Sequence, residues 1–227
     1  MPADLSPHRE IVHTELMLDS WRIVEMDNSP ETTAPNVLTI GHSDHPIEHF
    51  LNLLRTSSVE VVVDTRSYPY SNFAPQYDQQ PFKEALAKSN LQYLYLGREL
   101  GGRPDGEQYY DAEGRVLYNR VADSDIFRQG LTRLESGIRK FRVALLCAEE
   151  NPAQCHRRLL ISRVLIKRGI AVDHIRGDGR LQSEAELARE VGQNDDQLLL
   201  FQEAEAPEWK SIPSVLRKKR QGNSSAY

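Results

Sequence analysis

The chain is short of cysteine and has no long apolar run, and both shortages exclude classes of protein. Two cysteines in 227 residues are too few for the disulfide framework of a small secreted domain. The longest apolar runs, such as EVVVD and VALLCA, have the length of a strand, so we expect no membrane-spanning helix. The N-terminal residues lack the basic segment and apolar core of a secretory signal. We therefore expect a cytoplasmic protein with reduced thiols and no membrane partner.

A surplus of positive charge is also missing. The net charge is −5, which argues against a protein that coats nucleic acid with its whole surface. Apolar residues make up 39% of the chain and charged residues 27%, which is typical of a soluble globular protein. A local basic patch remains compatible with these values, and one basic run, Arg217–Arg220, lies close to the C terminus.

Strand-like and helix-like segments alternate in the middle of the chain. This alternation predicts an α/β domain with a mostly parallel five-stranded sheet and helices on both of its faces. The strands are expected in residues 37–43, 59–66, 91–97, 141–148 and 170–175. The helices are expected in residues 46–58, 81–90, 124–140 and 153–169, followed by a helical C-terminal extension in 183–193 and 196–206.

The composition of the chain predicts that a tail precedes this domain and another follows it. Residues 1–36 have no sustained period and end in the polar, proline-containing DNSPETTAP, so we predict a partly disordered N-terminal extension. The α/β domain is predicted to span residues 37–206. Residues 207–227 form a basic C-terminal tail.

Three polar clusters follow the first, second and fourth predicted strands. In parallel sheets, binding and catalytic residues usually lie at the carboxyl ends of the strands. These clusters would therefore share a crevice if the three strands are neighbours. The clusters are Gly41-His42-Ser43, Asp64-Thr65-Arg66-Ser67, and Cys147-Ala148-Glu149-Glu150 with Cys155-His156-Arg157.

The sequence resembles the domain-of-unknown-function family numbered 488. The resemblance depends on TIGHS, VDTRSYPYS, YLYLGRELGGRP, ALLCAEENPAQCHR and VDHI, which occur in this order across about residues 37–176. It implies a single Rossmann-like three-layer α/β domain. It implies no reaction and no cofactor, because the family has no settled activity and fold analogy cannot supply one.

The two cysteines leave several interpretations open. Cys147 ends a predicted strand near a helix N terminus, His156 and Arg157, a setting that favours a reactive thiolate, yet a buried cysteine can also be a core residue. A disulfide with Cys155 requires the loop to bring the two Cα atoms together. A zinc site would need a fourth ligand such as His42, and Cys-x7-Cys-His lacks the tight knuckle of structural zinc sites. We predict a catalytic thiol at Cys147, more reactive than Cys155, and no metal ligands.

Carboxylates and histidines supply the remaining candidate catalytic groups. Glu149 follows a buried strand and can act as a general base, can orient His156 or Arg66, or can simply cap the following helix. Asp64 and His42 are candidate acids or bases, although Asp64 can instead pair with Arg66 and His42 can hydrogen-bond its own loop. The predicted catalytic set is Cys147, Glu149, His156, His42 and Asp64.

An anion is expected to bind beside these groups. A helix N terminus at Cys155 with Arg157 and Arg66 can hold one phosphate. The polar loop from Arg98 to Arg120 is long enough to bind or cover a ligand, and its tyrosines 109, 110 and 118 can stack on a base. The predicted anion-binding set is Ser43, Arg66, Ser67, Arg103, Cys155 and Arg157.

Two functions from different classes fit these residues. The first is an enzyme, a thiol- or carboxylate-dependent hydrolase or transferase, that acts on a nucleotide, a nucleobase or nucleic acid. The second is a non-catalytic module that binds nucleic acid or a protein through the same crevice and the basic tail. The acidic composition and the paired glutamates favour the enzyme, because carboxylates in the cleft weaken the binding of a polyanion.

Overall fold

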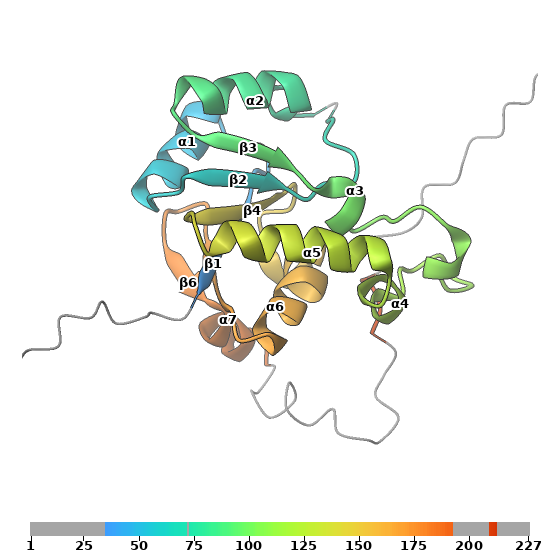
Figure 1. Ribbon diagram of the computed structural model, residues 1–227. Helices are drawn as coiled ribbons and strands as arrows, with labels where there is room; N and C mark the ends of the chain where they lie inside the picture. Colours follow the sequence, from blue (N-terminus) through green and yellow to red (C-terminus); the bar gives the residue numbers. More distant parts are fainter. Residues whose placement is uncertain (1–34, 72, 193–208, 213–227) are drawn as a thin grey trace, which may run out of the picture. The chain divides into compact units, whose positions relative to one another are not determined.

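A computed structural model describes residues 35–71, 73–192 and 209–212 (Figure 1). In this part of the chain the strands form one six-stranded sheet with the order β3-β2-β4-β1-β5-β6. Strands β1 to β5 are parallel, and β6 pairs antiparallel with β5. The strands are β1 (Asn36–Gly41), β2 (Val61–Asp64), β3 (Gln92–Tyr95), β4 (Val143–Cys147), β5 (Ala171–Ile175) and β6 (Leu181–Ser183).

The predicted α/β class and mostly parallel sheet are confirmed, and the predicted number of strands is wrong by one. The additional strand, β6, has three residues, of which only Gln182 is buried. So short a segment has no apolar alternation that would mark it as a strand in the sequence. Pairing with β5 nevertheless gives β6 a place in the sheet.

Helices cover both faces of the sheet (Figure 1), and the sheet separates the hydrophobic core into two clusters. Side chains alternate along β2, with Val61 and Val63 in the cluster that contains α5 residues and Val62 in the cluster that contains α1 and α2 residues. This alternation explains why all three of these strand positions are apolar, whichever face the side chain points to. The α-helices are α1 (Ile47–Thr56), α2 (Gln79–Lys88), α3 (Gly97–Leu100), α4 (Tyr118–Ala122), α5 (Asp125–Ile138), α6 (Arg163–Lys167) and α7 (Glu184–Glu190).

The helix predicted for residues 153–169 consists of three different pieces. A 3-10 helix, η3 (Pro152–Gln154), comes first, a π-helix, η4 (Arg157–Ser162), follows, and α6 completes the segment. Cys155 therefore does not lie in a first helical turn, since its backbone is extended with φ −115° and ψ 142°. The wide π turn places His156 and Arg157 differently from a continuous α-helix, and π segments are frequent at functional sites.

Residues 209–212 pack against the α/β domain. Lys210 forms an antiparallel bridge with Leu117, and Trp209 Nε1 donates a hydrogen bond to the Leu159 carbonyl oxygen over 2.8 Å. The helix predicted for 196–206 lies outside the described residues, as does the basic run Arg217–Arg220. Among the residues that are described, no helix has both the length and the apolar character needed to cross a membrane.

Candidate active site

The three polar clusters meet at the carboxyl edge of the sheet. The sheet order places β4 between β2 and β1, so the strands that the clusters follow are direct neighbours. Beyond the strand ends, His42 N donates to the Cys147 carbonyl oxygen over 3.0 Å, and Thr65 N donates to the Leu146 carbonyl oxygen over 3.0 Å. The three clusters therefore lie next to one another at this edge, but only residues of the second and third clusters line the pocket that opens there, and Gly41, His42 and Ser43 do not.

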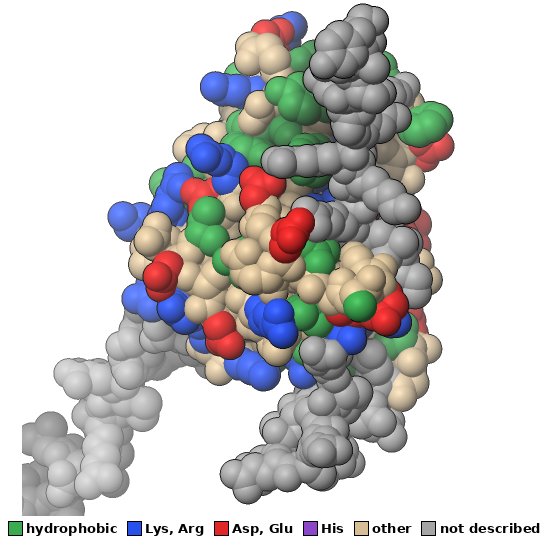
Figure 2. Space-filling view, turned by 90° about the vertical axis from the view of Figure 1, so that its right-hand side faces the viewer, with side chains coloured by type: hydrophobic (Ala, Val, Ile, Leu, Met, Phe, Trp, Pro, Cys, Tyr) green, Lys and Arg blue, Asp and Glu red, His purple; other side chains and the backbone are tan. Residues whose placement is uncertain are grey.

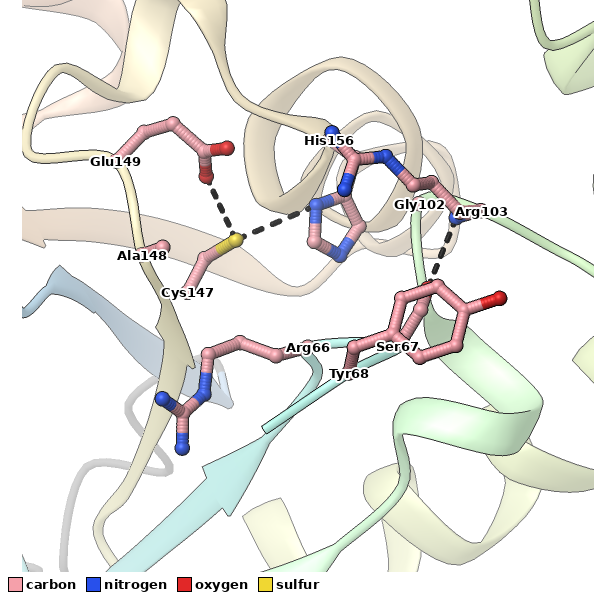
Figure 3. Close-up of a pocket in the computed structure, with 9 residues that line it drawn as sticks. All are labelled: Arg66, Ser67, Tyr68, Gly102, Arg103, Cys147, Ala148, Glu149 and His156. Atoms are coloured by element: carbon pink, nitrogen blue, oxygen red, sulfur yellow. Dashed lines mark hydrogen bonds between the residues drawn. The ribbon is translucent and has the colours of Figure 1, made fainter. Parts of the chain in front are cut away.

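A pocket of about 90 Å³ opens at this edge (Figure 3). One wall consists of the loop after β4, the other of the loop after β2 and the segment after α3. The lining residues are Arg66, Ser67, Tyr68, Gly102, Arg103, Cys147, Ala148, Glu149 and His156. Six of these residues belong to the predicted site. Arg66 and Ser67 follow β2, Cys147, Glu149 and His156 come from the end of β4 and the segment after it, and Arg103 follows α3.

Two thiols, a carboxylate and an imidazole face one another at the wall of this pocket. Cys147 Sγ lies 2.8 Å from Glu149 Oε2 and 3.4 Å from His156 Nδ1 (Figure 3). Cys155 Sγ lies 3.1 Å from the same Glu149 oxygen and 3.8 Å from the same His156 nitrogen. All four donor atoms lie within 4.8 Å of one another, so this set is also able to hold a metal ion.

The electrostatic setting of the two thiols is the reverse of our expectation. Burial, the largest influence, raises the pKa of Cys147 well above its ordinary value, and Cys155 and Glu149 raise it further. Burial also opposes the ionisation of Cys155, but the hydrogen bond with Cys147, the positive charge of Arg157 and the hydrogen bond with His156 hold its pKa well below the usual thiol value.

His156 is fixed in orientation from two sides. Its Nε2–H donates to the Thr65 carbonyl oxygen over 3.1 Å, so Nδ1 presents its lone pair to the thiols. Gly102 lies against the ring, because a Cβ added to this glycine would come within 2.6 Å of His156 Cγ. Gly102, the second glycine of the motif RELGGRP, thus makes room for the imidazole. The sequence analysis did not include this glycine in the site.

Arg157, predicted to bind an anion, does not line the pocket, and its guanidinium is bonded within the protein. The side chain is fully buried, and its guanidinium donates to the Glu149 carbonyl oxygen, to the Glu150 carbonyl oxygen over 2.6 Å, and to Thr39 Oγ1 over 3.3 Å. These bonds fix the loop that places Glu149 beside the thiols. Cys155 is likewise fully buried, and Ser43, on a turn with φ 46°, directs its hydroxyl to Asp44. None of these three predicted anion ligands is placed to meet an anion in the pocket.

Arg66 connects the pocket to two predicted catalytic residues that lie behind it. Its Nε and Nη2 donate to the two Asp64 carboxylate oxygens over 2.9 and 2.6 Å, and Nη1 donates to His42 Nε2 over 3.2 Å. Asp64 and His42 are both buried and do not line the pocket. Burial, followed by the charge of Arg66, lowers the pKa of His42 to about 4. In the structure these two residues position Arg66 and do not face the pocket themselves.

The two glutamates after β4 have separate surroundings. Glu150 accepts two hydrogen bonds of 3.0 Å from Arg176 and one of 3.1 Å from the Gly177 backbone. These partners overcome the effect of burial and lower the pKa of Glu150. Glu149 alone reaches the pocket and the thiols, so only one of the two carboxylates is placed for chemistry.

The loop from Arg98 to Arg120 contributes less to the pocket than its composition predicts. Arg103 lines the pocket, and its backbone N–H donates to Ser67 Oγ over 2.9 Å. Tyr118, in contrast, is fully buried and packs edge-on against Trp209, so it cannot stack on a ligand. Tyr109 and Tyr110 pack against the hydrophobic core. The aromatic residue at the pocket is Tyr68, which is 51% exposed and follows the second polar cluster directly in sequence.

Comparisons with known proteins give a family and no reaction. No curated protein and no solved structure matches the chain. The family model described as "Domain of unknown function DUF488" matches residues 46–164, slightly more than half of the 227 residues. The matched segment includes the pocket-lining loops after β2, α3 and β4. The chain belongs to the DUF488 family.

Proposed function

We propose that this protein is an enzyme that acts on a nucleotide, a nucleobase or a nucleic-acid residue in the pocket at the carboxyl edge of the sheet. The observation that supports this proposal is that Glu149, Cys147 and His156 line one pocket together with Arg66 and Arg103. Groups that can move protons therefore share the pocket with two arginines, of which Arg66 is already paired with Asp64 and Arg103 is the candidate to hold negative charge. Such a pocket is the default candidate for an active site in an α/β fold.

Glu149 is the proton-transfer group of this proposal. It lines the pocket, and its Oε2 lies within 3.1 Å of both thiol sulfurs. Arg157 holds the carbonyl oxygens of residues 149 and 150, so the backbone below the carboxylate is fixed. A carboxylate on a fixed backbone can take a proton from water or from a substrate hydroxyl and return it to the leaving group.

The size of the pocket restricts which part of the substrate enters it. A volume of about 90 Å³ is well below the roughly 300–1,000 Å³ of pockets that enclose a drug-sized ligand. One ring edge or one phosphate group therefore enters, and the rest of the substrate lies across the mouth. The half-exposed ring of Tyr68 lies at that mouth, where a base can stack on it.

The surface around the pocket favours an enzyme over a binder of long polyanions. Figure 2 views the molecule from the side toward which β2 and β3 point, and the visible Lys and Arg side chains there are interspersed with Asp and Glu side chains. A protein that binds nucleic acid without sequence preference usually has a continuous basic groove. A binding module remains the second candidate, supported by the exposed aromatic side chains of Tyr68, Tyr70 and Phe73.

The test is a product screen with matched variants. The protein is incubated with nucleosides, nucleoside monophosphates and short single-stranded DNA and RNA, and products are detected by liquid chromatography and mass spectrometry. We expect a product with the native protein. Its rate of formation should fall roughly 10²–10⁴-fold in Glu149→Gln, which retains size but cannot accept a proton.

Glu84→Gln is the matched control, because Glu84 is exposed on α2 and its Oε1 accepts a hydrogen bond from Gln80 of the same helix. It should react at the native rate. Full activity of a folded Glu149→Gln protein would remove Glu149 from the mechanism. Binding of an oligonucleotide without turnover, weakened by Arg103→Ala and unchanged by Glu149→Gln, would instead identify a binding module.

A further inference from the structure

We propose that Cys147, Cys155 and His156 bind a zinc ion at the wall of the pocket, with the Glu149 carboxylate as the fourth ligand. This goes beyond the proposed function and does not depend on it, since a metal can be measured whether or not a substrate is known. The sequence spacing predicted no metal ligands. The loop after β4 nevertheless brings the donor atoms of all four side chains within 4.8 Å of one another.

The distances from the His156 nitrogen to the two sulfurs suit a tetrahedral ion. Zinc bonds of about 2.3 Å to sulfur and about 2.0–2.2 Å to nitrogen or oxygen place neighbouring ligand atoms roughly 3.3–3.8 Å apart. His156 Nδ1 lies 3.4 Å from Cys147 Sγ and 3.8 Å from Cys155 Sγ. Glu149 Oε2 is closer to the sulfurs, at 2.8 and 3.1 Å, and a small rotation of this side chain widens both distances.

The surroundings of the ligands match those of a metal site. Histidines that bind metals usually donate their second ring N–H to a carbonyl or carboxylate, which fixes the tautomer. His156 does so through Nε2 and the Thr65 carbonyl oxygen, and its Nδ1 faces the thiols. The Arg157 backbone N–H points to Cys155 Sγ at 3.5 Å, where it supports a thiolate. The contact with Thr65 leaves the ligand atom Nδ1 available, and a thiolate sulfur that accepts one hydrogen bond can still bind a metal ion.

The ligand types select zinc and a site of the catalytic kind. Two thiolates and an imidazole suit zinc better than magnesium or calcium, which prefer oxygen. Cys147, Cys155 and His156 are buried and fixed, whereas Glu149 is exposed and lines the pocket. Three fixed ligands and one movable ligand give an ion with a position that can open toward the pocket. A water molecule or a substrate oxygen can occupy that position when Glu149 moves away.

The closing experiment measures the metal directly. The full chain is produced without an affinity tag in zinc-supplemented medium, purified under reducing conditions and analysed by elemental analysis. We expect about one zinc ion per chain. Replacing this zinc by Co²⁺ should give the thiolate-to-cobalt charge-transfer bands and the strong visible bands of a tetrahedral site. X-ray absorption at the zinc edge should show sulfur together with nitrogen or oxygen neighbours.

Substitutions of single ligands locate the ion. Cys147→Ser, Cys155→Ser and His156→Asn should each lower zinc affinity by roughly tenfold or more, while His49→Asn, at an exposed histidine, should retain it. If the cysteine variants do not fold, the cobalt and X-ray spectra of the native chain still decide the matter. Zinc-free native protein without cobalt–thiolate bands, or a Cys147–Cys155 disulfide in native protein, would overturn the proposal. If zinc is bound but no substrate is turned over, only the proposed enzymatic function is contradicted. If a substrate is turned over by zinc-free protein, only the proposed metal site is contradicted.

Discussion

His42 is held as a neutral ring by its two hydrogen-bond partners. Its Nδ1–H donates to the Ser43 carbonyl oxygen over 2.6 Å, and its Nε2 accepts from Arg66 over 3.2 Å. A second proton on Nε2 would therefore face the N–H of a cation. Burial and this arginine lower the pKa of His42 from 6.5 to about 4.

We predict that His42 makes the protein sensitive to acid. Between pH 6.5 and pH 4 the unfolded chain binds a proton at this residue and the folded chain does not, so stability falls as the pH falls. At roughly 1.4 kcal/mol per pKa unit, this shift should lower the free energy of unfolding by about 3 kcal/mol between neutral pH and pH 4. Denaturant titrations of the native protein and of His42→Phe across this range should show a flatter pH dependence for the variant. Parallel curves would contradict the prediction.

Single residues also mark where sequence reasoning fails. Arg157 was predicted to bind an anion because it is a cation beside a presumed helix N terminus. In the structure its donors are already used by Thr39 and by two backbone carbonyls. A sequence gives the charge of a side chain but not whether its hydrogen bonds are satisfied internally. Glu149 and Glu150 illustrate the same limit, because only the fold shows that Arg176 holds one of them.

At the scale of elements, β1 and the loop after β4 approach each other more closely than a side chain allows. A Cβ on Gly41 would lie 1.8 Å from the Glu149 carbonyl oxygen. This contact involves backbone on both sides, so it cannot be relieved by a change of rotamer. Gly41 is therefore required by the position of the loop that presents Glu149 to the pocket.

We expect Gly41→Ala to lower the free energy of unfolding by about 1–3 kcal/mol or more, because overpacking forces backbone shifts. Gly137→Ala is the matched control. Gly137 lies inside α5, and its nearest neighbour to an added Cβ is Val143 at 4.0 Å. There the exchange should stabilise the protein by up to about 1 kcal/mol. Chemical denaturation of both variants tests the opposite signs, and equal effects would show that the approach at Gly41 is unimportant.

Elements were predictable from the sequence where their pattern was long and regular. The apolar runs of β1, β2 and β4 correspond to strands, since buried parallel strands are apolar on both faces. The segment from residue 153 to 169 has helical periodicity throughout, and periodicity cannot distinguish a π turn from an α turn. The sequence therefore indicated a continuous helix where a 3-10 helix and a π-helix precede α6.

At the scale of the whole molecule, the candidate site depends on the strand order. The sequence predicted that polar residues follow three strands, and the order β2-β4-β1 makes these strands neighbours. Nothing in the local pattern specifies this order, because it results from crossover connections between distant segments. The thiol cluster could not be predicted for a related reason. The loop between Cys147 and Cys155 folds back through η3, and the spacing of the two residues does not reveal that return.

Residues 209–212 connect the end of the described chain to the elements beside the site. Trp209 lies with its ring centroid 4.6 Å from the Arg163 guanidinium, and its Nε1 donates to the Leu159 carbonyl oxygen in η4. The Tyr118 N–H donates to the Trp209 carbonyl oxygen over 2.7 Å, and Ser211 exchanges hydrogen bonds with Val116. The segment thus contacts both α4 and η4, the π-helix that begins directly after His156.

We predict that this segment is required for full stability. Two truncated chains, one ending at residue 208 and one at residue 212, differ only in these four residues, so their comparison isolates the contribution of the segment. Loss of the packed Trp209 side chain alone should cost roughly 3 kcal/mol. At roughly 2–4 °C per kcal/mol for a chain of this length, the shorter form should unfold about 6–12 °C lower in a thermal scan. Trp209→Ala in the full chain should reproduce most of the decrease, because the tryptophan makes the apolar contacts. Equal melting temperatures for the two truncated chains would show that the segment is not part of the folded domain.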